Sequence, residues 1–341
     1  MTGEGALTSP PLAESLAALV GGGPWTVLKD TKVTVVRSGD LVVKAHPPDT
    51  DETALAARLR MAAALPGVLL PPASPRVGHV AGRPVTVWPA GEPVDPGDPD
   101  AAPWEAAAVL LARLHATPLD TPLDGSAASP VDGAQATPPD GVPLSRALPP
   151  AGGPARVARA VALLDALDGQ ASEGRNGPGG AYAAPVAVIR AAFATLPREA
   201  RAAASGLVPA ARAEGPHAVT HGDWHLGQIV RHRGAWALID VDDLGVGVAA
   251  WDLARPAAWY ATGLLSPDLW ERFLCAYLGA GGSAVPAGDP WRELDVPARA
   301  LTVQLAATAV AAAGAEGRPL DEVERTLVSS CGRITQAAAT R

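Results

Sequence analysis

The sequence predicts an α+β protein in two parts, a small antiparallel sheet near the start and a larger, mainly helical part after it. The first observation is a group of short runs rich in β-branched residues and separated by polar turns, which is typical of strands joined as hairpins. These runs are Trp25–Leu28, Val33–Val36 and Leu41–Ala45. The second observation is that apolar residues recur at helical spacing beyond residue 93, as in Trp104–His115. We therefore expect one domain at 1–92 and another at 93–341.

The first part also contains signals for a helix and for a second strand pair. Asp51 is a candidate N-cap, because the segment 51–65 that it begins has apolar residues at helical spacing. Strand-like runs then flank the turn at Ala81-Gly82. After them, Trp88–Ala90 leads into a stiff connector that contains proline. We expect these elements to complete a compact unit around the three strands.

Beyond residue 93 the chain alternates between helical patterns and a region of low complexity. Residues 117–155 consist mostly of Pro, Gly, Ala, Ser and Asp with almost no apolar periodicity, so we expect a flexible insertion there. Strand-like runs return at 218–220 and 236–239. The helical patterns cover 156–168, 184–213 and the chain from Trp251 onward.

Composition favours a soluble, cytoplasmic protein. The formal net charge is −8 and no basic stripe is present, which argues against a nucleic-acid partner. The two cysteines, Cys275 and Cys331, lack disulfide or metal spacing, as expected in a reducing compartment. The start lacks the basic segment of a signal peptide, and each apolar run is interrupted before the roughly 18 residues that a membrane span needs. Nothing in the sequence indicates the oligomeric state.

Lysine is rare in this chain, which has three lysines and 24 arginines. Such a bias is typical of coding preference, so each retained lysine invites a chemical explanation. The three are Lys29, Lys32 and Lys44, all within the first strand region. An ammonium group in that region could contact nucleotide phosphates. Lys44 could also be an ordinary residue at the end of a strand.

Two short polar motifs carry the candidate chemistry. They are HGDWHLGQ at 221–228 and LIDVD at 238–242. Phosphoryl transfer needs a carboxylate for the acceptor hydroxyl, oxygen ligands for Mg²⁺ and a cation near the nucleotide phosphates. Kinase-like loops supply the first two with an Asp, an amide five positions later and then a second Asp, an order that Asp223, Gln228 and Asp240 reproduce. A hairpin about 231–234 would return Asp240 beside the loop that carries Asp223.

These motifs resemble those of the aminoglycoside phosphotransferase and choline-kinase-like superfamily, distant relatives of the protein kinases. The order HGDxHxxQ, LID and Trp251-Asp252-Leu253-Ala254 makes the resemblance strong over 218–256, and weaker similarity extends over 25–92 and 104–115. The resemblance implies a bilobal protein-kinase-like fold with a small antiparallel-sheet N-lobe and a larger, mainly helical C-lobe. It also implies a small-molecule kinase that uses ATP and Mg²⁺.

The same resemblance implies a role for each matching residue. Asp223 would be the catalytic carboxylate, and Lys44 would contact the nucleotide phosphates. Gln228 and Asp240 would be ligands of Mg²⁺. Structural support of the catalytic loop would come from Asp252, His221 and His225.

Two features depart from the usual pattern of the family. Gln228 stands where the family usually has Asn, and its amide oxygen can still ligate Mg²⁺. The His-Leu-Gly-Gln form is similar to that of maltokinases and bacterial glucosamine kinases, which favours a sugar or aminosugar acceptor. Asp242 resembles a second carboxylate of those sugar kinases and is a further candidate metal ligand. The glycine-rich loop is missing, so Thr31 and Lys32 would have to cover the phosphates instead.

Three of the expected nucleotide contacts have a second interpretation. Glu52 shares a helical face with apolar residues, so it could pair with Lys44 in the nucleotide site, or it could be an exposed residue of the first turn. Trp88 and Ala90 are expected to contact adenine through backbone groups, as a kinase hinge does. A simple linker would make no such contact.

The predicted function is transfer of the γ-phosphate of ATP to a hydroxyl of a sugar, aminosugar or aminoglycoside-like small molecule. One alternative is a nucleotide-binding pseudokinase without turnover, which Gln228 and the missing glycines leave open and which the intact Asp223 and Asp240 disfavour. Another is a metal-dependent hydrolase, because His221 and His225 have the HxxxH spacing of a zinc site. The glycine between them indicates a loop rather than one helical face, which argues against zinc.

Overall fold

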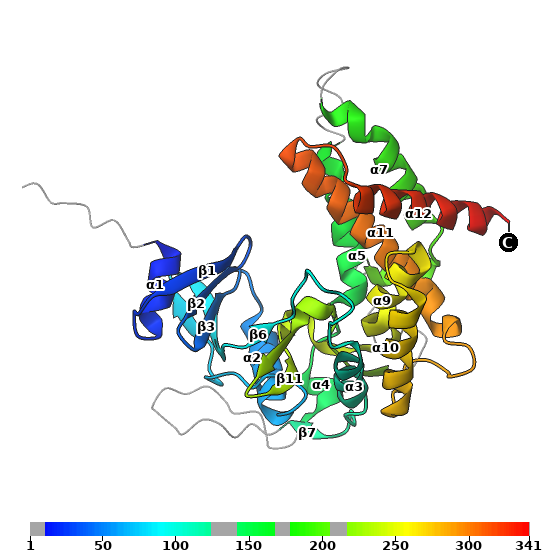
Figure 1. The fold of residues 1–341 in the computed structure, drawn as a ribbon. Coiled ribbons are helices and arrows are strands. Elements are labelled where there is room, and N and C mark those ends of the chain that lie inside the picture. Colours follow the sequence, from blue (N-terminus) through cyan, green and yellow to red (C-terminus); the bar gives the residue numbers. More distant parts are fainter. Residues whose placement is uncertain (1–10, 124–141, 168–177, 205–216, 341) are drawn as a thin grey trace, which may run out of the picture. The chain divides into compact units, whose positions relative to one another are not determined.

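The computed structural model describes residues 11–123, 142–167, 178–204 and 217–340. The chain, drawn as a ribbon in Figure 1, divides into two compact units. The first unit comprises Met1–Val94, Pro122–Ala147 and Ile229–Asp242, and the second comprises Asp95–Thr121, Leu148–Gln228 and Asp243–Arg341. We expected 122–147 and 229–242 in the second domain, but both belong to the first unit. The later segment contains the LIDVD motif.

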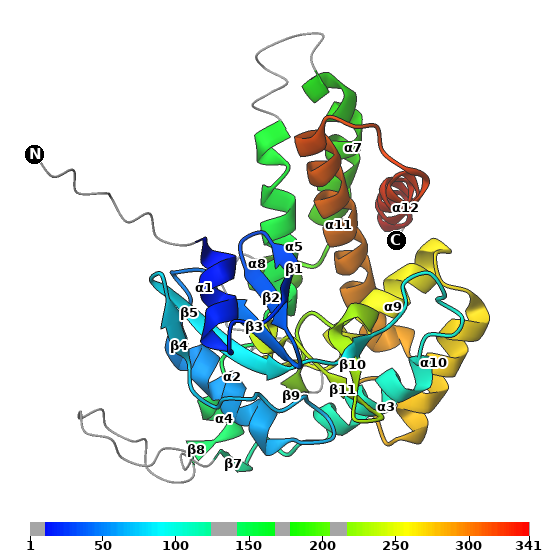
Figure 2. The same ribbon diagram turned by 60° about the vertical axis from the view of Figure 1, so that its left-hand side comes forward.

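A five-stranded antiparallel sheet forms the centre of the first unit, with the order β1-β2-β3-β5-β4. The strands are β1 (Trp25–Asp30), β2 (Thr34–Ser38), β3 (Leu41–Ala45), β4 (Gly78–Val80) and β5 (Arg83–Pro89). The predicted hairpins are thus present, and Gly39 supplies the positive φ of 57° that the turn between β2 and β3 requires. Helix α1 (Leu12–Leu19) lies beside the sheet (Figure 2), where Leu16 packs against Val36 and Val43.

The predicted helix of the first unit is α2 (Glu52–Ala64), and it begins as expected. The side chain of Asp51 accepts a hydrogen bond from the backbone N–H of Ala54 at 3.0 Å, which is the contact of an N-cap. Leu55 and Leu59 are fully buried on one face of this helix. The helical spacing of apolar residues in this segment therefore marks a face that packs inside the unit.

Later parts of the chain complete the first unit. Strands β10 (Ile229–His232) and β11 (Ala235–Leu238) form the predicted hairpin, and β6 (Glu92–Pro93) pairs with β10. The turn of the hairpin places Arg233 and Gly234 at φ values of 50° and 82°, which matches the right-handed twist of the two strands. The N–H of Leu70 donates to the carbonyl of Leu238 at 2.8 Å and ties the hairpin to the rest of the unit.

The ends of the predicted insertion at 117–155 are ordered elements. Strands β7 (Pro122–Leu123) and β8 (Val142–Pro143) pair with each other, and α4 (Leu144–Ala147) follows. The middle of the insertion, 124–141, lies outside the described residues. The described ends of the predicted insertion therefore differ from the expected flexible segment.

Helices dominate the second unit. They are α3 (Trp104–His115), α5 (Gly153–Ala162), α7 (Pro178–Ala194), α8 (Arg198–Ala204), α9 (Ala250–Thr262), α10 (Pro267–Gly279), α11 (Trp291–Glu316) and α12 (Glu322–Ala339). Four of them, α5, α7, α11 and α12, lie close together, with α12 crossing α11 in Figure 1, and share one buried apolar cluster. Alanine makes up much of this cluster, and its small side chain lets the helices approach closely.

Helix α11 is long and apolar enough to cross a membrane by length and composition alone, and no other described helix is. However, 61% of its apolar window is buried inside the structure. Ala300, Val303 and Ala307 belong to the cluster shared with α5, α7 and α12. Helix α11 is therefore a core helix of the second unit, and such a helix is expected to have apolar residues on several faces.

Two strands complete the second unit and frame its candidate site. Strand β9 (His217–Thr220) pairs antiparallel with β12 (Gly245–Val248). The sequence predicted β9 but not β12, which has the sequence GVGV. Glycine is depleted in strands, and here close contacts explain its presence, because a Cβ at Gly245 would collide with the backbone at Pro149. The chain passes directly from β12 into α9.

Candidate active site

The loop after β9 carries the predicted catalytic residue of the second unit. Asp252, in the first turn of α9, accepts hydrogen bonds from the backbone N–H groups of His221 (2.6 Å) and Gly222 (2.8 Å). Gly222 has a φ of 83°, and a Cβ there would collide with the backbone of Asp243. The loop therefore requires glycine at this position, and Asp252 fixes the backbone just before Asp223.

Asp252 is itself held from its other side. Nε2 of His115 lies 3.0 Å from the carboxylate, and Nδ1 of His115 lies 2.8 Å from the hydroxyl oxygen of Tyr277. Burial alone would raise the pKa of Asp252. The hydrogen bond and charge of His115, together with the contact to His221, outweigh burial and hold that pKa below its ordinary value. Asp252 is thus a buried carboxylate that holds the backbone of the loop.

Two arginines that we did not predict hold Asp223. Arg156 of α5 lies 2.8 Å from its Oδ2 atom, and Arg255 of α9 lies 3.1 Å from its Oδ1 atom. Arg255 also donates to the carbonyl of Trp224 at 3.3 Å. Burial and the charge of Arg156 lower the pKa of Arg255 below its ordinary value, against the opposing effect of Asp223. Both oxygens of the Asp223 carboxylate therefore have a cationic partner.

One sequence signal could have indicated one of these arginines. Arg255 follows Asp252 by three positions in α9, and residues three apart share a helical face. Arg156 has no such signal, because it lies next to the low-complexity stretch and only the packing of α5 brings it to the loop.

Asp243 is a second acidic residue of this cluster that we did not single out. Its carboxylate lies 2.7 Å from Arg156 and 3.7 Å from Arg159. Its carbonyl accepts a hydrogen bond from the N–H of Gly152 at 3.0 Å. Asp243 directly follows the LIDVD motif, so the run of acidic residues continues past the point at which the motif ends.

The remaining predicted residues of the loop lie in a tight turn. Gln228 ends a short 3-10 helix (Leu226–Gln228), and its N–H donates to the carbonyl of His225 at 2.8 Å. Nδ1 of His225 accepts a hydrogen bond from the N–H of Gly227 at 3.1 Å, so this ring caps its own turn. Among the described residues, no three His, Cys, Asp or Glu side chains converge as a metal site. The zinc interpretation of His221 and His225 therefore has no geometric support.

In the first unit, Lys44 lies between two carboxylates of the LIDVD motif. Its Nζ atom is 2.6 Å from Oδ1 of Asp240 and 2.7 Å from Oδ2 of Asp242. Burial disfavours the charged forms of both Lys44 and Asp242. Nevertheless the pKa of Lys44 is raised and that of Asp242 is lowered, because the opposite charges and their hydrogen bonds outweigh burial. Asp240 has a φ of 60°, a backbone conformation that non-glycine residues rarely adopt.

A short chain of polar contacts extends this cluster to β5. Nδ1 of His46 lies 3.6 Å from Asp242, and Nε2 of His46 lies 2.9 Å from the hydroxyl of Thr86. The indole N–H of Trp88 donates to the same hydroxyl at 2.9 Å. His46 was not predicted, although it directly follows β3 and lies two positions after Lys44, the spacing at which extended residues share a side.

Ala90 and Trp88, the residues expected to contact adenine, form hydrogen bonds to other residues of the first unit. The N–H of Ala90 donates to the carbonyl of Asp40 at 2.7 Å, and the carbonyl of Ala90 accepts from Nδ1 of His232 at 2.9 Å. Trp88 directs its indole N–H inward to Thr86. The Ala90 groups thus differ from the open backbone groups that a nucleotide-contacting hinge would present.

Other predicted nucleotide residues lie on the surface of the first unit. Of the two interpretations left open for Glu52, the structure has the exposed first-turn residue: Oε1 of Glu52 lies 2.9 Å from Nε2 of His79, whereas Lys44 pairs with aspartates. Thr31 and Lys32 lie in the exposed turn between β1 and β2.

The carboxylates of Asp240 and Asp242 have chemistry that suits Mg²⁺. Their side chains are 32% and 33% exposed, and carboxylate oxygens are the donors that this ion prefers. The ammonium group of Lys44 between them shows that a positive charge is stable at this position. Mg²⁺ usually takes one or two carboxylates and completes its shell with phosphate oxygens and water. The pair therefore fits the ion, whereas Gln228, the other expected ligand, lies in the second unit.

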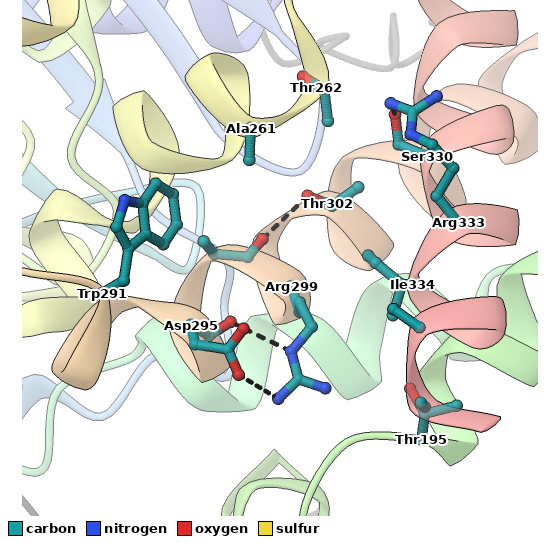
Figure 3. Close-up of a pocket in the computed structure, with 13 residues that line it drawn as sticks. Thr195, Ala261, Thr262, Trp291, Asp295, Arg299, Thr302, Ser330, Arg333 and Ile334 are labelled. Carbon is teal, nitrogen blue, oxygen red and sulfur yellow. Dashed lines mark hydrogen bonds and ion pairs between the residues drawn. The ribbon is translucent and has the colours of Figure 1, made fainter. Parts of the chain in front are cut away.

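A large cavity of the second unit, about 460 Å³, lies among α9, α11 and α12 and does not include Asp223 (Figure 3). Asp295 and Arg299 pair there at 2.6 Å, and Arg333 donates to Ser330 at 2.7 Å. These polar groups therefore already have partners. A smaller cavity is lined by Asp223 itself, and its other polar and aromatic lining residues are Arg156, Arg255, Trp224, Trp251 and Gln304.

Comparison with known proteins shows the family and the fold of this chain. The profile of the phosphotransferase enzyme family matches residues 30–294. The chain has no significant match among curated proteins. It resembles the structure of a choline/ethanolamine kinase family protein from Mesorhizobium loti, with 18% identity, coverage of 96% of this chain and 93% of that one, and a TM-score of 0.52.

Two further structures are similar in fold. One is a thermostable mutant of aminoglycoside phosphotransferase APH(4)-Ia in a ternary complex with AMP-PNP and hygromycin B, with 12% identity, coverage of 96% and 99%, and a TM-score of 0.55. The other is the AMP-bound spectinomycin phosphotransferase APH(9)-Ia, with 12% identity, coverage of 90% of each chain and a TM-score of 0.51. At these identities the likeness concerns the fold, and it confirms the α+β, protein-kinase-like class.

Proposed function

Because the chain belongs to the phosphotransferase enzyme family and is therefore a small-molecule kinase, we propose that it transfers the γ-phosphate of ATP to a hydroxyl of a sugar, aminosugar or aminoglycoside-like compound. The observation that carries the proposal is Lys44 held between Asp240 and Asp242. A cation and two carboxylates are the groups that nucleotide phosphates and their Mg²⁺ require. Two proteins of similar fold bind AMP-PNP and AMP, which supports ATP as the donor.

In this reaction Asp223 orients the acceptor hydroxyl and accepts its proton. The hydroxyl oxygen forms a bond to the γ-phosphorus while the bond from that phosphorus to the bridging oxygen of ADP breaks. The products are a phosphate ester and ADP, and Asp223 then passes the proton to water. The hydrogen bonds from His221 and Gly222 to Asp252 keep the backbone before Asp223 in place, which preserves the orientation that transfer needs.

Lys44 and the candidate metal ligands would act on the nucleotide. Lys44 contacts the phosphates of ATP, while Asp240, Asp242 and Gln228 are the residues that would hold Mg²⁺. The ion supplies charge neutralisation of the phosphates when it is bound. Thr31 and Lys32, in the exposed turn between β1 and β2, would cover the phosphates in place of a glycine-rich loop.

The setting that suits this activity is the cytoplasm, where ATP is available. Cys275 and Cys331 are both free thiols, which fits a reducing compartment. The partner is a small molecule, and the acidic composition argues against nucleic acid.

The proposal is tested by measuring ADP release with a panel of sugars, aminosugars and aminoglycosides, each compared with ATP alone. We expect at least one acceptor to stimulate release. Asp223→Asn should lower that rate by about 10² to 10⁴-fold, the range for loss of a general base. Asp165→Asn is the matched control, because Asp165 is 73% exposed and makes one surface ion pair.

A different outcome would support a pseudokinase. ATP that raises the melting temperature while no acceptor stimulates ADP release would indicate nucleotide binding without turnover. Equal rates in the wild type and in Asp223→Asn would exclude the proposed role of this carboxylate.

A further inference from the structure

Lys44 engages both of the carboxylates that suit Mg²⁺ in the first unit. Its Nζ atom forms ion pairs with Asp240 at 2.6 Å and with Asp242 at 2.7 Å, and its side chain is 12% exposed. Among the described residues, Lys44 pairs with no carboxylate other than these two. The cation that the two aspartates hold is therefore the protein's own ammonium group.

The backbone around the three residues is fixed independently of the lysine side chain. Lys44 stands within β3, which pairs with β2 on one side and with β5 on the other. Leu238, two residues before Asp240, exchanges hydrogen bonds with the segment 68–70. Val241, between the two aspartates, is 1% exposed. The ammonium group can therefore move on its flexible stem while the backbone that carries the two carboxylates stays in place.

A divalent ion and the ammonium group compete for the same oxygens. Mg²⁺ binds carboxylate oxygens at about 2.1 Å, so an ion ligated by Asp240 and Asp242 would lie close to the ammonium group of Lys44. Like charges repel strongly in such a partly buried site, because water and salt screen them little. Two carboxylates and one ammonium leave a net charge of −1, and withdrawal of the ammonium group makes it −2. The aspartates therefore bind a divalent ion well only when Lys44 has another partner.

The phosphates of a nucleotide supply that partner. Phosphate oxygens are anionic and accept charge-assisted hydrogen bonds from an ammonium group. They also complete the coordination of Mg²⁺, which one or two carboxylates leave unfilled. A nucleotide can thus take the ammonium group of Lys44 and free Asp240 and Asp242 for the ion in a single exchange.

We propose that Lys44 closes Asp240 and Asp242 to free divalent ions, so that the metal enters this site only together with a nucleotide. This inference rests on the proposed phosphotransferase function, which identifies the nucleotide, and it adds an order of binding. The protein without nucleotide does not take up the metal first. Lys44 is thus the residue that makes the site selective for the complex of metal and nucleotide.

The test measures binding of Mn²⁺, which prefers the same oxygen ligands as Mg²⁺ and has its own magnetic signal. Electron paramagnetic resonance reports the concentration of free Mn²⁺ in the presence of the full chain without nucleotide. Lys44→Met should bind Mn²⁺ about tenfold or more tightly than the wild type, because the pair of carboxylates loses its internal cation. Lys44→Arg keeps the positive charge and should bind Mn²⁺ as weakly as the wild type.

Two further variants assign the gain to this site. Lys44→Met combined with Asp242→Asn should lose most of the gain, since one of the two carboxylates has been removed. Lys29→Met is the matched control, because it removes the same charge from an exposed position on β1. It should bind Mn²⁺ like the wild type. Circular dichroism confirms that each variant is folded.

A second measurement examines the role of the nucleotide. The relaxation rate of water protons rises when Mn²⁺ is held on a protein, and a mixture of Mn²⁺ and AMP-PNP without protein provides the baseline. In the wild type we expect an enhanced rate with Mn²⁺ and AMP-PNP together and little enhancement with Mn²⁺ alone. Lys44→Met should show enhancement with Mn²⁺ alone.

The outcomes separate this inference from the proposed function. The inference is overturned if the wild type binds Mn²⁺ alone as tightly as Lys44→Met does, if the gain survives in the double variant, or if AMP-PNP produces no enhancement in the wild type. ADP release in any of these cases would leave the proposed phosphotransferase function standing. The expected Mn²⁺ results without ADP release from any acceptor would support the inference and contradict the proposed turnover.

Discussion

At the scale of single residues, the buried carboxylate of Asp252 has the clearest energetic role. It accepts two backbone hydrogen bonds from the loop and a contact from His115. Asp252→Asn keeps the size of the side chain but removes its charge, and its amide group would face N–H donors. We expect a loss of about 2–3 kcal/mol in the free energy of unfolding, typical of hydrogen bonds to a buried charged group. Urea denaturation followed by circular dichroism measures this loss.

The same experiment has an internal comparison. Asp165→Asn should change stability by less than about 0.5 kcal/mol, because exposed ion pairs contribute little. Equal unfolding midpoints for the two variants would contradict the role given to Asp252.

Two carboxylates with lowered pKa values, Asp242 and Asp252, predict the acid response of the protein. A carboxyl whose pKa is lower in the folded state binds protons more tightly when the chain unfolds. Its contribution to stability is therefore complete above the ordinary carboxyl pKa of about 3.9 and is lost as the pH falls through the folded value. We expect the urea midpoint to fall below pH 4, with a shallower fall in Asp252→Asn. Parallel curves would contradict this assignment.

The two thiols should differ in reactivity. Cys275 is exposed, whereas burial raises the pKa of Cys331 to about 12 and removes its thiolate at neutral pH. A thiol reagent such as DTNB should label one cysteine quickly in the native protein and the second only after unfolding. Cys275→Ser should abolish the fast phase, and fast labelling that persists in this variant would contradict the prediction.

The sequence could single out some candidate site residues and not others, for a physical reason. Asp223, Asp240 and Asp252 lie in short motifs whose spacing reflects local backbone geometry. Arg156 reaches Asp223 only through the packing of α5, so no local pattern marks it. For Glu52 the sequence left two interpretations open, and a helical-face argument cannot choose between them because it does not consider the two aspartates that attract Lys44.

At the scale of elements, the turn of the β10–β11 hairpin gives a direct test of backbone conformation. Gly234 has a φ of 82° and open space around it, so a methyl group there would cause strain without a collision. Gly234→Ala should lower stability by about 1 kcal/mol. Gly288→Ala is the control, because Gly288 also has open space but no positive φ. Thermal unfolding measures both, and equal losses would contradict the role of φ.

The elements also show what sequence patterns capture. The strands of the first sheet, α2 with its Asp51 cap and the β10–β11 hairpin all follow from local signals. Strand β12 does not, since Gly245 and Gly247 have low strand propensity and are required only because other backbone and side-chain atoms approach them closely. Tertiary contact rather than propensity determines that strand.

At the scale of the whole molecule, the family and the protein-kinase-like fold were predictable, and both are confirmed. The extent of each compact unit was harder to predict from the sequence. Composition and periodicity are read along the chain, so they favoured one boundary near residue 92. The first unit instead includes 122–147 and 229–242, and no local signal reveals that a distant segment belongs to an earlier unit.

Nucleotide binding should be visible as stabilisation of the whole protein. ATP with Mg²⁺ at 100 times its dissociation constant adds about 2.7 kcal/mol to the free energy of unfolding. We expect the melting temperature to rise with ATP, and the rise to be much smaller in Lys44→Met. Lys29→Met is the control, because Lys29 is exposed on β1. The comparison uses the shift caused by ligand, since loss of Lys44 also leaves two carboxylates without their cation. Equal shifts in the two variants would contradict the role of Lys44.

The scarcity of lysine also makes the protein unusually easy to label selectively. Lys29 and Lys32 are exposed, whereas the Lys44 side chain is 12% exposed between its aspartates. An amine-reactive probe at neutral pH should therefore modify the first two side chains and leave the third largely intact. A lysine-specific protease can cut only after Lys29, Lys32 and Lys44, so 45–341 stays in one fragment. Mass spectrometry of that digest would report directly on the environment of Lys44, with no need to engineer a label into the chain.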